Sequence, residues 1–375
     1  MQIVHLVPAL FGPDGIVGGA ERYAYELARH MSASVPTTLV SFGARDGEER
    51  VGRLRVRLIG DPWLVRGQQT NPLSAGLFGE LRLADVVHCH QQHVLMSSVA
   101  AAWCRLTRRR VFVSDLGGGG WDVSAYISTD RWFHGHLHLS EYSRRIFGHE
   151  HDARACVVGG GVDVEKFSPV PRAPAGRDVL FVGRLLPHKG VEDLIMALPD
   201  GMTLRIVGPE PDLETRGRLT ALARGKDVTF LHHLDDAALV REYQQALCVV
   251  LPSVYRSADG RETKVPELLG QTLLEGMACG IPAVCTRVAS MPELVDDGVT
   301  GFVVPPNDPR SLANRLSWLR THPEKVARMG AAARRRVLDR FTWPSVVARC
   351  LARYDAVLSH PATRSRVVAP GAARS

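Results

Sequence analysis

The sequence predicts an α/β protein with two largely parallel sheets, and three observations lead to this class. Its 375 residues exceed the roughly 250 that one core of ordinary size contains, so two domains are expected. Hydrophobic residues make up 45% and charged residues 23%, which excludes a disordered or collagen-like chain. Short apolar runs alternate with helical periodicity in both halves, and this alternation is typical of parallel strands joined by helices.

The first half begins with a strand, a loop and a helix. Residues 3–7 form an apolar run, Gly18 and Gly19 end a glycine-rich loop, and Tyr23 and Leu27 recur with helical spacing. Four further strands are expected in this half, at residues 38–40, 54–59, 85–88 and 111–113.

A proline-rich segment at residues 168–174 separates the halves, because the fixed φ of proline makes a stiff connector. We therefore predict two Rossmann-like domains, 1–168 and 169–340. Strands in the second are expected at residues 178–183, 204–208, 228–231, 248–251 and 282–285. The end of the chain, residues 359–375, is rich in Ala, Pro, Arg and Ser and is expected to be disordered.

Composition also excludes several functions. No window approaches the ~18 apolar residues of a membrane span, and the N-terminus lacks the features of a signal peptide, so a cytoplasmic protein is expected. The seven cysteines include no C-x-x-C pair, which argues against disulfides and a zinc ribbon. The net charge of +7 is spread thinly, so nucleic acid is not an expected partner.

The most informative motif is the segment 266–282. Gly270 permits a tight turn, and Gln271 and Thr272 then begin a helix whose free amides suit an anion. Glu267 precedes the turn and Glu275 lies inside the helix, where carboxylates could accept hydrogen bonds from the hydroxyls of a sugar and a ribose. Taken alone, two glutamates eight residues apart are more simply explained as structural or solvated.

A second motif follows the first strand of the second half. Arg184 and Lys189 lie in the loop after Gly183, and two cations at the carboxyl end of a strand suit a departing diphosphate. Ordinary solvation of the loop is the alternative. Only five of the 46 basic residues are lysines, which favours a specific role for Lys189.

Together these motifs resemble the family 4 retaining glycosyltransferases of the GT-B fold. The resemblance includes Gly18-Gly19, three smaller blocks at 161–167, 291–302 and 341–343, and is strongest over about 175–345. It implies two Rossmann-like domains facing each other across a cleft. The first domain would bind the acceptor and the second the nucleotide sugar, and a helix at 341–358 would cross back to the first domain.

The resemblance also implies roles for single residues. Arg184 and Lys189 would hold the diphosphate, Glu267 would contact the donor sugar, and Glu275 the ribose. The backbone of Gly270, Gln271 and Thr272 would contact the sugar or its phosphate, and the base would lie near the turn that contains His233 and Leu234. Gly18 and Gly19 would close on the donor from the opposite domain. No metal or other cofactor is expected, because the two cations could replace a metal at the diphosphate.

The chain departs from the family pattern in the first half. Many relatives have a histidine after the strand at 111–113, whereas this sequence has Asp115, Leu116 and then four glycines. Asp115 could contact the sugar or the acceptor, or it could be a plain residue at a strand end. His88 and His90 form an H-x-H pair, which by itself is weak support for a metal site.

The expected function is transfer of a sugar from a nucleoside diphosphate donor, with a UDP-sugar favoured and a GDP-sugar possible, to a hydroxyl acceptor. Such acceptors include lipid-linked saccharides, glycans and small natural products. Two alternatives stay open. The missing histidine motivates a non-catalytic nucleotide-sugar-binding partner of another transferase, and the two-domain scaffold also allows a nucleotide-sugar epimerase, against which the pair Glu267 and Glu275 argues. Peripheral membrane contact could involve Trp103, Arg105 and 108–110, although a solvated helix end is the simpler interpretation.

Overall fold

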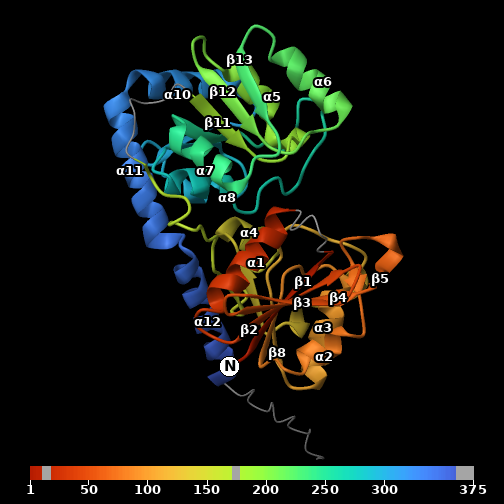
Figure 1. Ribbon diagram of the computed structural model, residues 1–375. Helices are drawn as coiled ribbons and strands as arrows, with labels where there is room; N and C mark the ends of the chain where they lie inside the picture. Colours follow the sequence, from red (N-terminus) through yellow and green to blue (C-terminus); the bar gives the residue numbers. More distant parts are fainter. Residues whose placement is uncertain (11–17, 171–177, 360–375) are drawn as a thin grey trace, which may run out of the picture.

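Two mainly parallel sheets form the centres of two α/β domains in the computed structural model, which describes residues 1–10, 18–170 and 178–359 (Figure 1). Most of the proline-rich connector and the terminal segment expected to be disordered lie outside these residues. Helices cover the sheets, as the alternating sequence pattern predicts.

The first sheet contains eight strands in the described part of the chain, in the order β10-β9-β8-β7-β1-β2-β4-β3. Their bounds are β1 (Ile3–Leu10), β2 (Thr37–Gly43), β3 (Gly47–Val51), β4 (Leu54–Gly60), β7 (Val86–Cys89), β8 (Arg110–Val113), β9 (Gly135–His138) and β10 (Ala155–Val157). All pairs are parallel except β3 with β4. A separate two-stranded sheet joins β5 (Trp63–Leu64) to β6 (Pro72–Leu73).

The helices of the first domain are α1 (Gly19–Met31), α2 (Leu77–Leu81), α3 (Leu95–Leu106) and α4 (Glu141–Ile146), with short 3-10 turns η1 (Val65–Gly67), η2 (Val123–Ala125) and η3 (Asp130–Trp132). Helix α1 is amphipathic, and it buries Tyr23, Leu27 and Met31 while its charged side chains point outward.

The second sheet has six described strands, all parallel, in the order β13-β12-β11-β14-β15-β16. They are β11 (Asp178–Val182), β12 (Thr203–Val207), β13 (Asp227–Leu231), β14 (Cys248–Leu251), β15 (Ala283–Thr286) and β16 (Gly301–Val304). The helices are α5 (Val191–Ala197), α6 (Leu213–Leu222), α7 (Asp236–Gln245), α8 (Gln271–Ala278), α9 (Met291–Leu294), α10 (Pro309–Thr321), α11 (Pro323–Arg340) and α12 (Trp343–Ser359), with the 3-10 turn η4 (Pro187–Lys189).

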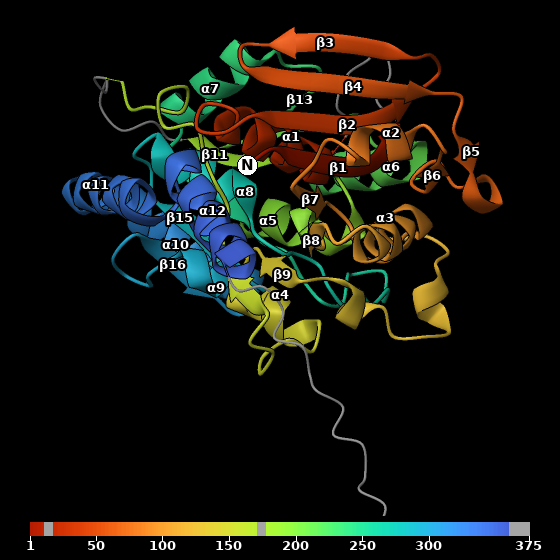
Figure 2. The same ribbon diagram turned by 90° about the horizontal axis from the view of Figure 1, so that it is seen from below.

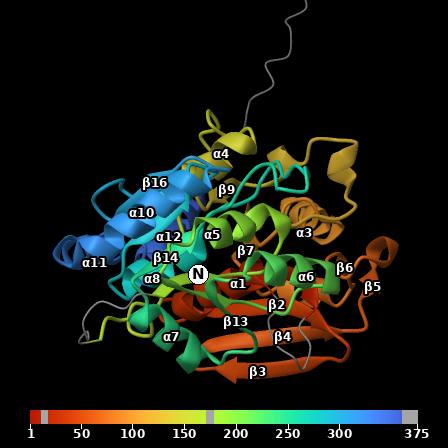
Figure 3. The same ribbon diagram turned by 90° about the horizontal axis from the view of Figure 1, so that it is seen from above.

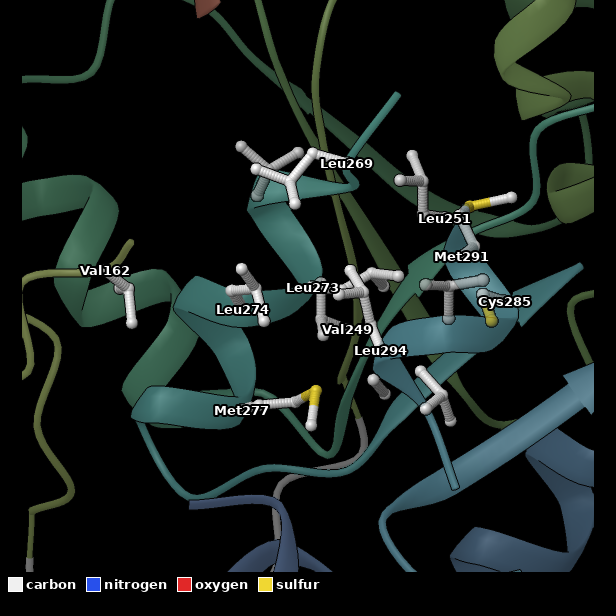
Figure 4. Close-up of a cluster of buried hydrophobic side chains, with 14 of the residues drawn as sticks. Val162, Val249, Leu251, Leu269, Leu273, Leu274, Met277, Cys285, Met291 and Leu294 are labelled. Carbon is white, nitrogen blue, oxygen red and sulfur yellow. The ribbon is translucent and has the colours of Figure 1, made fainter. Parts of the chain in front are cut away.

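Helix α8 is fixed by the core of the second domain. Its Leu273, Leu274 and Met277 are buried against side chains that include Val249 of β14 and Leu294 of α9 (Figure 4). Fully burying one such aliphatic side chain contributes about 1.5–3 kcal/mol. The packing therefore holds the N-terminus of α8 in a defined position relative to the end of β14.

Helix α12 leaves the second domain and packs beside α1 of the first (Figure 2). Its Tyr354 is fully buried and its hydroxyl lies 2.7 Å from Nδ1 of His88 on β7. The backbone amide of Val162 also donates to the carbonyl of Phe341, at 2.8 Å. The two domains are thus joined both by the chain near residue 162 and by α12.

Candidate active site

The order of the second sheet places two loops side by side. The chain moves outward from β11 to β12 and β13, then returns to add β14 on the other side of β11. The connections that follow β11 and β14 run in opposite directions along the sheet. Ligands of open α/β sheets bind at the carboxyl ends of the strands at such a point. The loop after β11 carries Arg184 and Lys189, and the segment after β14 carries Glu267 and Gly270.

Glycine allows these two loops to meet. Gly190 has φ +67°, and a Cβ there would lie 2.0 Å from the carbonyl oxygen of Pro252, directly after β14. Any side chain at position 190 would therefore push the loops apart.

Lys189 and Glu267 form an ion pair between these loops. The Lys189 Nζ lies 2.5 Å from Oε2 of Glu267, and each side chain is 15% exposed. The other carboxylate oxygen, Oε1, accepts a hydrogen bond from the Gly270 amide at 3.2 Å. One carboxylate thus connects the cation that follows β11 to the residue that caps α8.

The start of α8 is arranged as the sequence predicts. Gly270 adopts the left-handed conformation, with φ 82° and ψ 47°, and Gln271 and Thr272 begin the helix. The first amides of a helix have no intrahelical acceptor and carry its positive dipole end. The Gln271 side chain is already engaged, because its Nε2 donates to the carbonyl of Gly161 at 2.9 Å. Only the backbone of Gln271 therefore fits the expected role.

Arg184 is exposed, and its side chain forms no hydrogen bond or ion pair with any residue within the described ranges, although its carbonyl accepts from the Leu186 amide at 2.9 Å. Its charge acts near Lys189 and Glu267, as the neighbouring imidazole of His188 indicates. Burial lowers the pKa of His188, Lys189 and Arg184 lower it further, and Glu267 opposes them. Arg184 is therefore a free guanidinium beside the ion pair.

Glu275 is placed differently from the other charged residues. It is 6% exposed, and its Oε2 accepts a hydrogen bond from the Tyr243 hydroxyl at 2.8 Å. Burial raises the pKa of Glu275, while Tyr243 and then Arg22 lower it. Contact with a ribose would require the ligand to reach a carboxylate that already has a protein partner.

The remaining predicted donor contacts lie on turns. His233 is exposed with φ 58°, and Leu234 is partly buried against the core. Gly18 caps α1, and a Cβ at Gly18 would lie 2.5 Å from Oε2 of Glu21, whereas Gly19 is exposed with open space around it. Within the described part of the chain, none of these four residues forms a hydrogen bond with Lys189 or Glu267.

On the first domain, Asp115 is buried after β8 and has uncharged hydrogen-bond donors. Its Oδ1 accepts from the Gly117 amide at 2.9 Å and from Nε2 of Gln91 at 3.4 Å. Its Oδ2 is buried without a hydrogen-bond partner and lies 3.8 Å from Nε2 of His93. Burial raises the pKa of Asp115, and these donors and His93 oppose the rise.

The Asp115 loop approaches the second domain beside Glu267. A Cβ on Gly117, which has φ +84°, would lie 2.8 Å from Cδ1 of Leu268. The Ser140 hydroxyl, at the start of α4, also donates to the carbonyl of Leu268 at 3.0 Å. The strand-end loops of the two domains therefore meet at Leu268.

Comparisons with known proteins decide the family. Residues 162–336 match the model "Glycosyl transferases group 1", and residues 17–166 match "Glycosyltransferase Family 4". The chain is 30% identical over 356 residues to a mannosyltransferase of Mycolicibacterium smegmatis, covering 88% of this chain and 84% of that protein. The full name of this relative is GDP-mannose-dependent alpha-(1-6)-phosphatidylinositol monomannoside mannosyltransferase.

The chain belongs to glycosyltransferase family 4.

A D-inositol 3-phosphate glycosyltransferase of Saccharomonospora viridis is 34% identical over 211 residues, which are 50% of this chain and 46% of that one. Solved structures give the fold of this glycosyltransferase as GT-B. The Anabaena protein HepE in complex with UDP and glucose superimposes with a TM-score of 0.73 at 19% identity, covering 95% of this chain and 100% of that one. Sucrose-phosphate synthase of Thermosynechococcus elongatus gives 0.71 at 19% identity, covering 96% and 100%.

Sequence reasoning missed several partners in this glycosyltransferase. Gln91 and His93 contact Asp115 from the loop after β7, and Tyr243 and Arg22 surround Glu275. For Gln91 and His93 the only available signal was their position directly after a predicted strand, and no signal pointed to Tyr243 or Arg22, which lie within helices α7 and α1.

The basic segment considered for membrane contact is partly engaged within the glycosyltransferase. Arg105 donates to the carbonyl of Arg131 at 2.5 Å, and Arg109 donates to that of Ala84. The Arg109 guanidinium also lies 5.7 Å from the ring centre of Trp103. Among the helices that the structure describes, none is both long and apolar enough to cross a bilayer.

Proposed function

We propose that this glycosyltransferase moves a sugar from a nucleoside diphosphate donor to a hydroxyl group, with retention at the anomeric carbon. The observation that carries the proposal is the connected set of Lys189, Glu267 and Gly270 beside the free cation of Arg184. This set offers two positive charges and helix amides at one place, which suits a doubly charged leaving group.

The Lys189–Glu267 ion pair would rearrange when the donor binds. Lys189 would turn toward the diphosphate, and Glu267 would accept hydrogen bonds from sugar hydroxyls instead. The pair keeps both side chains charged and in place before binding, and neither charge is left unpaired at 15% exposure. Arg184 would add the planar fork that matches phosphate oxygens.

In the reaction, the bond between the anomeric carbon and the diphosphate oxygen breaks, and the electron pair leaves with the diphosphate. The acceptor oxygen forms its bond to the same face of that carbon. Its proton passes to the departing phosphate oxygen, so no protein base is required. Lys189, Arg184 and the first amides of α8 would stabilise the charge that develops on the leaving group, and no metal ion is needed there.

Asp115 would hold a hydroxyl in this scheme. A buried carboxylate oxygen without a donor is unfavourable by about 1–3 kcal/mol, and a sugar or acceptor hydroxyl could supply the missing hydrogen bond. The adjacent contact of Gly117 with Leu268 keeps this carboxylate close to the donor side. Asp115 would thus take the position at which many relatives have a histidine.

The donor has to be identified by testing several nucleotide sugars. The sequence favours a UDP-sugar in our interpretation, but the relative that covers 88% of this chain carries GDP-mannose in its name. GDP-mannose therefore comes first among candidate donors, followed by UDP-glucose and other UDP-sugars. For the acceptor, a lipid-linked or free inositol-containing alcohol is the first choice, by the names of the relatives.

A thermal-shift panel of nucleotide sugars tests donor binding. A donor present at about 100 times its dissociation constant stabilises the folded protein by about 2.7 kcal/mol, which is easily measured. The panel is run with and without Mg²⁺, and an equal shift in both is expected. Product from the best donor and an alcohol acceptor is then analysed by NMR, where the anomeric configuration of the donor should be kept.

Each outcome of these measurements has a clear meaning. Transfer with retention supports the proposal. Donor binding without transfer to any alcohol would instead support a non-catalytic binding partner, and release of an isomerised nucleotide sugar without acceptor would support an epimerase. Product with inverted configuration would overturn the mechanism but not the family.

A further inference from the structure

The first domain contains two groups of three potential metal ligands within the described residues. One is His5, His88 and His90, and the other is Asp130, His136 and His149. In each group, one ligand atom from every residue lies within 4.8 Å of the other two. The two groups differ in which of their imidazole nitrogens already have hydrogen-bond partners.

In the first group, the imidazole nitrogens mostly bind one another or the surrounding protein. His5 Nδ1 lies 2.7 Å from His90 Nε2, and His5 Nε2 lies 3.2 Å from Sδ of Met31. Both nitrogens of His88 are engaged, by Ser114 and Tyr354. Only Nδ1 of His90 lacks a partner. A metal there would have to break several hydrogen bonds in a fully enclosed core.

The second group has unused nitrogens that face a carboxylate. Nδ1 of His136 and Nε2 of His149 are buried without hydrogen-bond partners, and the two residues are 1% and 5% exposed. Nε2 of His149 lies 3.9 Å from Oδ1 of Asp130, and the two imidazole centres are 4.0 Å apart. Two imidazoles that each have an unpartnered nitrogen, and one carboxylate, thus lie close together from three different segments. Oδ1 of Asp130 also accepts a hydrogen bond from Nε2 of Gln92 at 2.5 Å, so a metal ion would compete with that amide for the oxygen.

The other nitrogen of each imidazole is also engaged, and for His136 the partner is a backbone carbonyl, as expected around a metal. Nε2 of His136 lies 3.2 Å from the carbonyl oxygen of Asp130, to which it donates, and this leaves Nδ1 as the free acceptor. Nδ1 of His149 lies 3.0 Å from Nε2 of His138. Histidines that bind metals commonly use the second nitrogen in this way, which fixes the orientation of the ring.

We propose that Asp130, His136 and His149 bind one divalent transition metal ion of the zinc class. Tetrahedral ligands at about 2.0–2.1 Å from zinc are separated by about 3.3 Å, so small side-chain rotations would close the group. Three protein ligands leave a fourth position for water or another ligand. This site is separate from the diphosphate, so it departs from the expectation that the chain binds no metal without adding a metal to the transfer step.

The position of the site suggests what the metal does. Asp130 begins η3, His136 lies on β9, and His149 follows α4, which packs on β9 (Figure 3). Asp130 also lines a cavity of about 360 Å³ together with His93 and residues 124–129. The ion would therefore fasten the loop that forms this cavity to the sheet, close to the His93 neighbour of Asp115.

The test measures metal binding directly, on tag-free protein that has been stripped with a chelator. The wild type, Asp130→Asn and His149→Gln are titrated with Zn²⁺ against a chromophoric competitor. His151→Gln is the matched control, because His151 is an exposed histidine two residues from His149. We expect one Zn²⁺ per wild-type chain and per control chain, and at least tenfold weaker binding in the two site variants.

The Co²⁺ form gives a second readout that does not depend on activity. Tetrahedral Co²⁺ absorbs visible light far more strongly than octahedral Co²⁺, so wild type and His151→Gln should be intensely coloured and the site variants pale. Asp130 has a 43% exposed side chain, so Asp130→Asn decides the question even if His149→Gln fails to fold. Zn²⁺ binding that is absent in the wild type, unchanged in Asp130→Asn, or lost in the control would overturn the proposal.

Discussion

The two sets of loops that meet at Leu268 satisfy their charged groups in opposite ways. On the second domain, Lys189 and Glu267 neutralise each other, and the Gly270 amide takes the second carboxylate oxygen. On the first domain, Asp115 has only uncharged donors on one oxygen and no hydrogen-bond partner on the other. The second domain must exchange partners to bind a ligand, whereas the first already has an unfilled acceptor.

This difference indicates how the work is divided. In the proposed mechanism an anionic diphosphate would compete well for Lys189, because the helix amides and Arg184 would attract it to the same place. A hydroxyl group is a weak competitor for an ion pair, but it is a good donor to an unpartnered carboxylate oxygen. Charge stabilisation should therefore belong to the second domain and hydroxyl positioning to the first.

The largest effect is expected from Lys189→Ala. If Lys189 stabilises the departing diphosphate, its loss should lower kcat/KM by about 10²–10³, the range found when one stabilising donor to a developing anion is removed. Steady-state kinetics with the best donor measure this. Lys325→Ala, at an exposed lysine of the same domain, is the matched control and should keep normal kinetics. Near-normal turnover of folded Lys189→Ala would contradict the assignment of charge stabilisation to the second domain.

Five of the six described strands of the second domain, all but β16, could be predicted from sequence for physical reasons. Glycines and prolines fix its loops locally, as Gly190 and Gly270 do with their positive φ, and buried apolar runs mark its strands. The ion pair of Lys189 with Glu267 then follows from the order of β11 and β14, which no local pattern gives. Their roles toward a donor stay predictions.

The first domain was less predictable because its site depends on contacts between loops. Asp115 could be singled out after a strand, but its partners Gln91 and His93 lie more than twenty residues earlier. Strand β9 was missed altogether, since His136 and His138 occupy buried positions at which apolar residues are expected. The Asp130 group was missed for the same reason.

A smaller effect is expected from Asp115→Asn. Loss of a charged hydrogen-bond acceptor corresponds to about 1.5–3 kcal/mol, so kcat should fall by about 10–100-fold. The KM for the donor should change little, because the diphosphate contacts remain. Asp339→Asn, at an exposed position on α11, is the control. A change confined to the KM for the donor would mean that Asp115 contributes to donor binding. The contrast drawn between the two domains would then be wrong.

The same variant should change the pH dependence of stability. Burial raises the pKa of Asp115, so the folded protein holds this proton at a pH where the unfolded chain has lost it. Stability of the wild type therefore falls as pH rises above the ordinary carboxyl range. Asp115→Asn lacks this decline, so its thermal midpoint relative to wild type should rise between about pH 4 and pH 7. A falling difference would mean that the ionised carboxylate is stabilised in the fold.

The smallest effect is expected where exposed charges join the two domains. Asp236 at the start of α7 pairs with Arg22 of α1 at 3.1 Å and with Lys166 at 2.5 Å, and its side chain is 65% exposed. Exposed pairs contribute about 0–1 kcal/mol each, so Asp236→Ala should lower the thermal midpoint by less than about 4 °C. The shift should shrink further at about 1 M salt, where the Debye length is about 3 Å.

Asp236→Ala also removes the ion-pair partner of Arg22, whereas the charge of the buried Glu275, which already raises the pKa of Arg22, remains. If Arg22 turns toward Glu275, Asp236→Ala and Glu275→Gln will not be additive, and a double-mutant cycle on the thermal midpoint measures the coupling. Strict additivity would show that Arg22 acts only at the surface. Coupling would instead mean that Arg22 of the first domain influences the Tyr243–Glu275 pair of the second. The two domains would then interact at this pair, whereas Lys189 and Asp115 are assigned separate tasks.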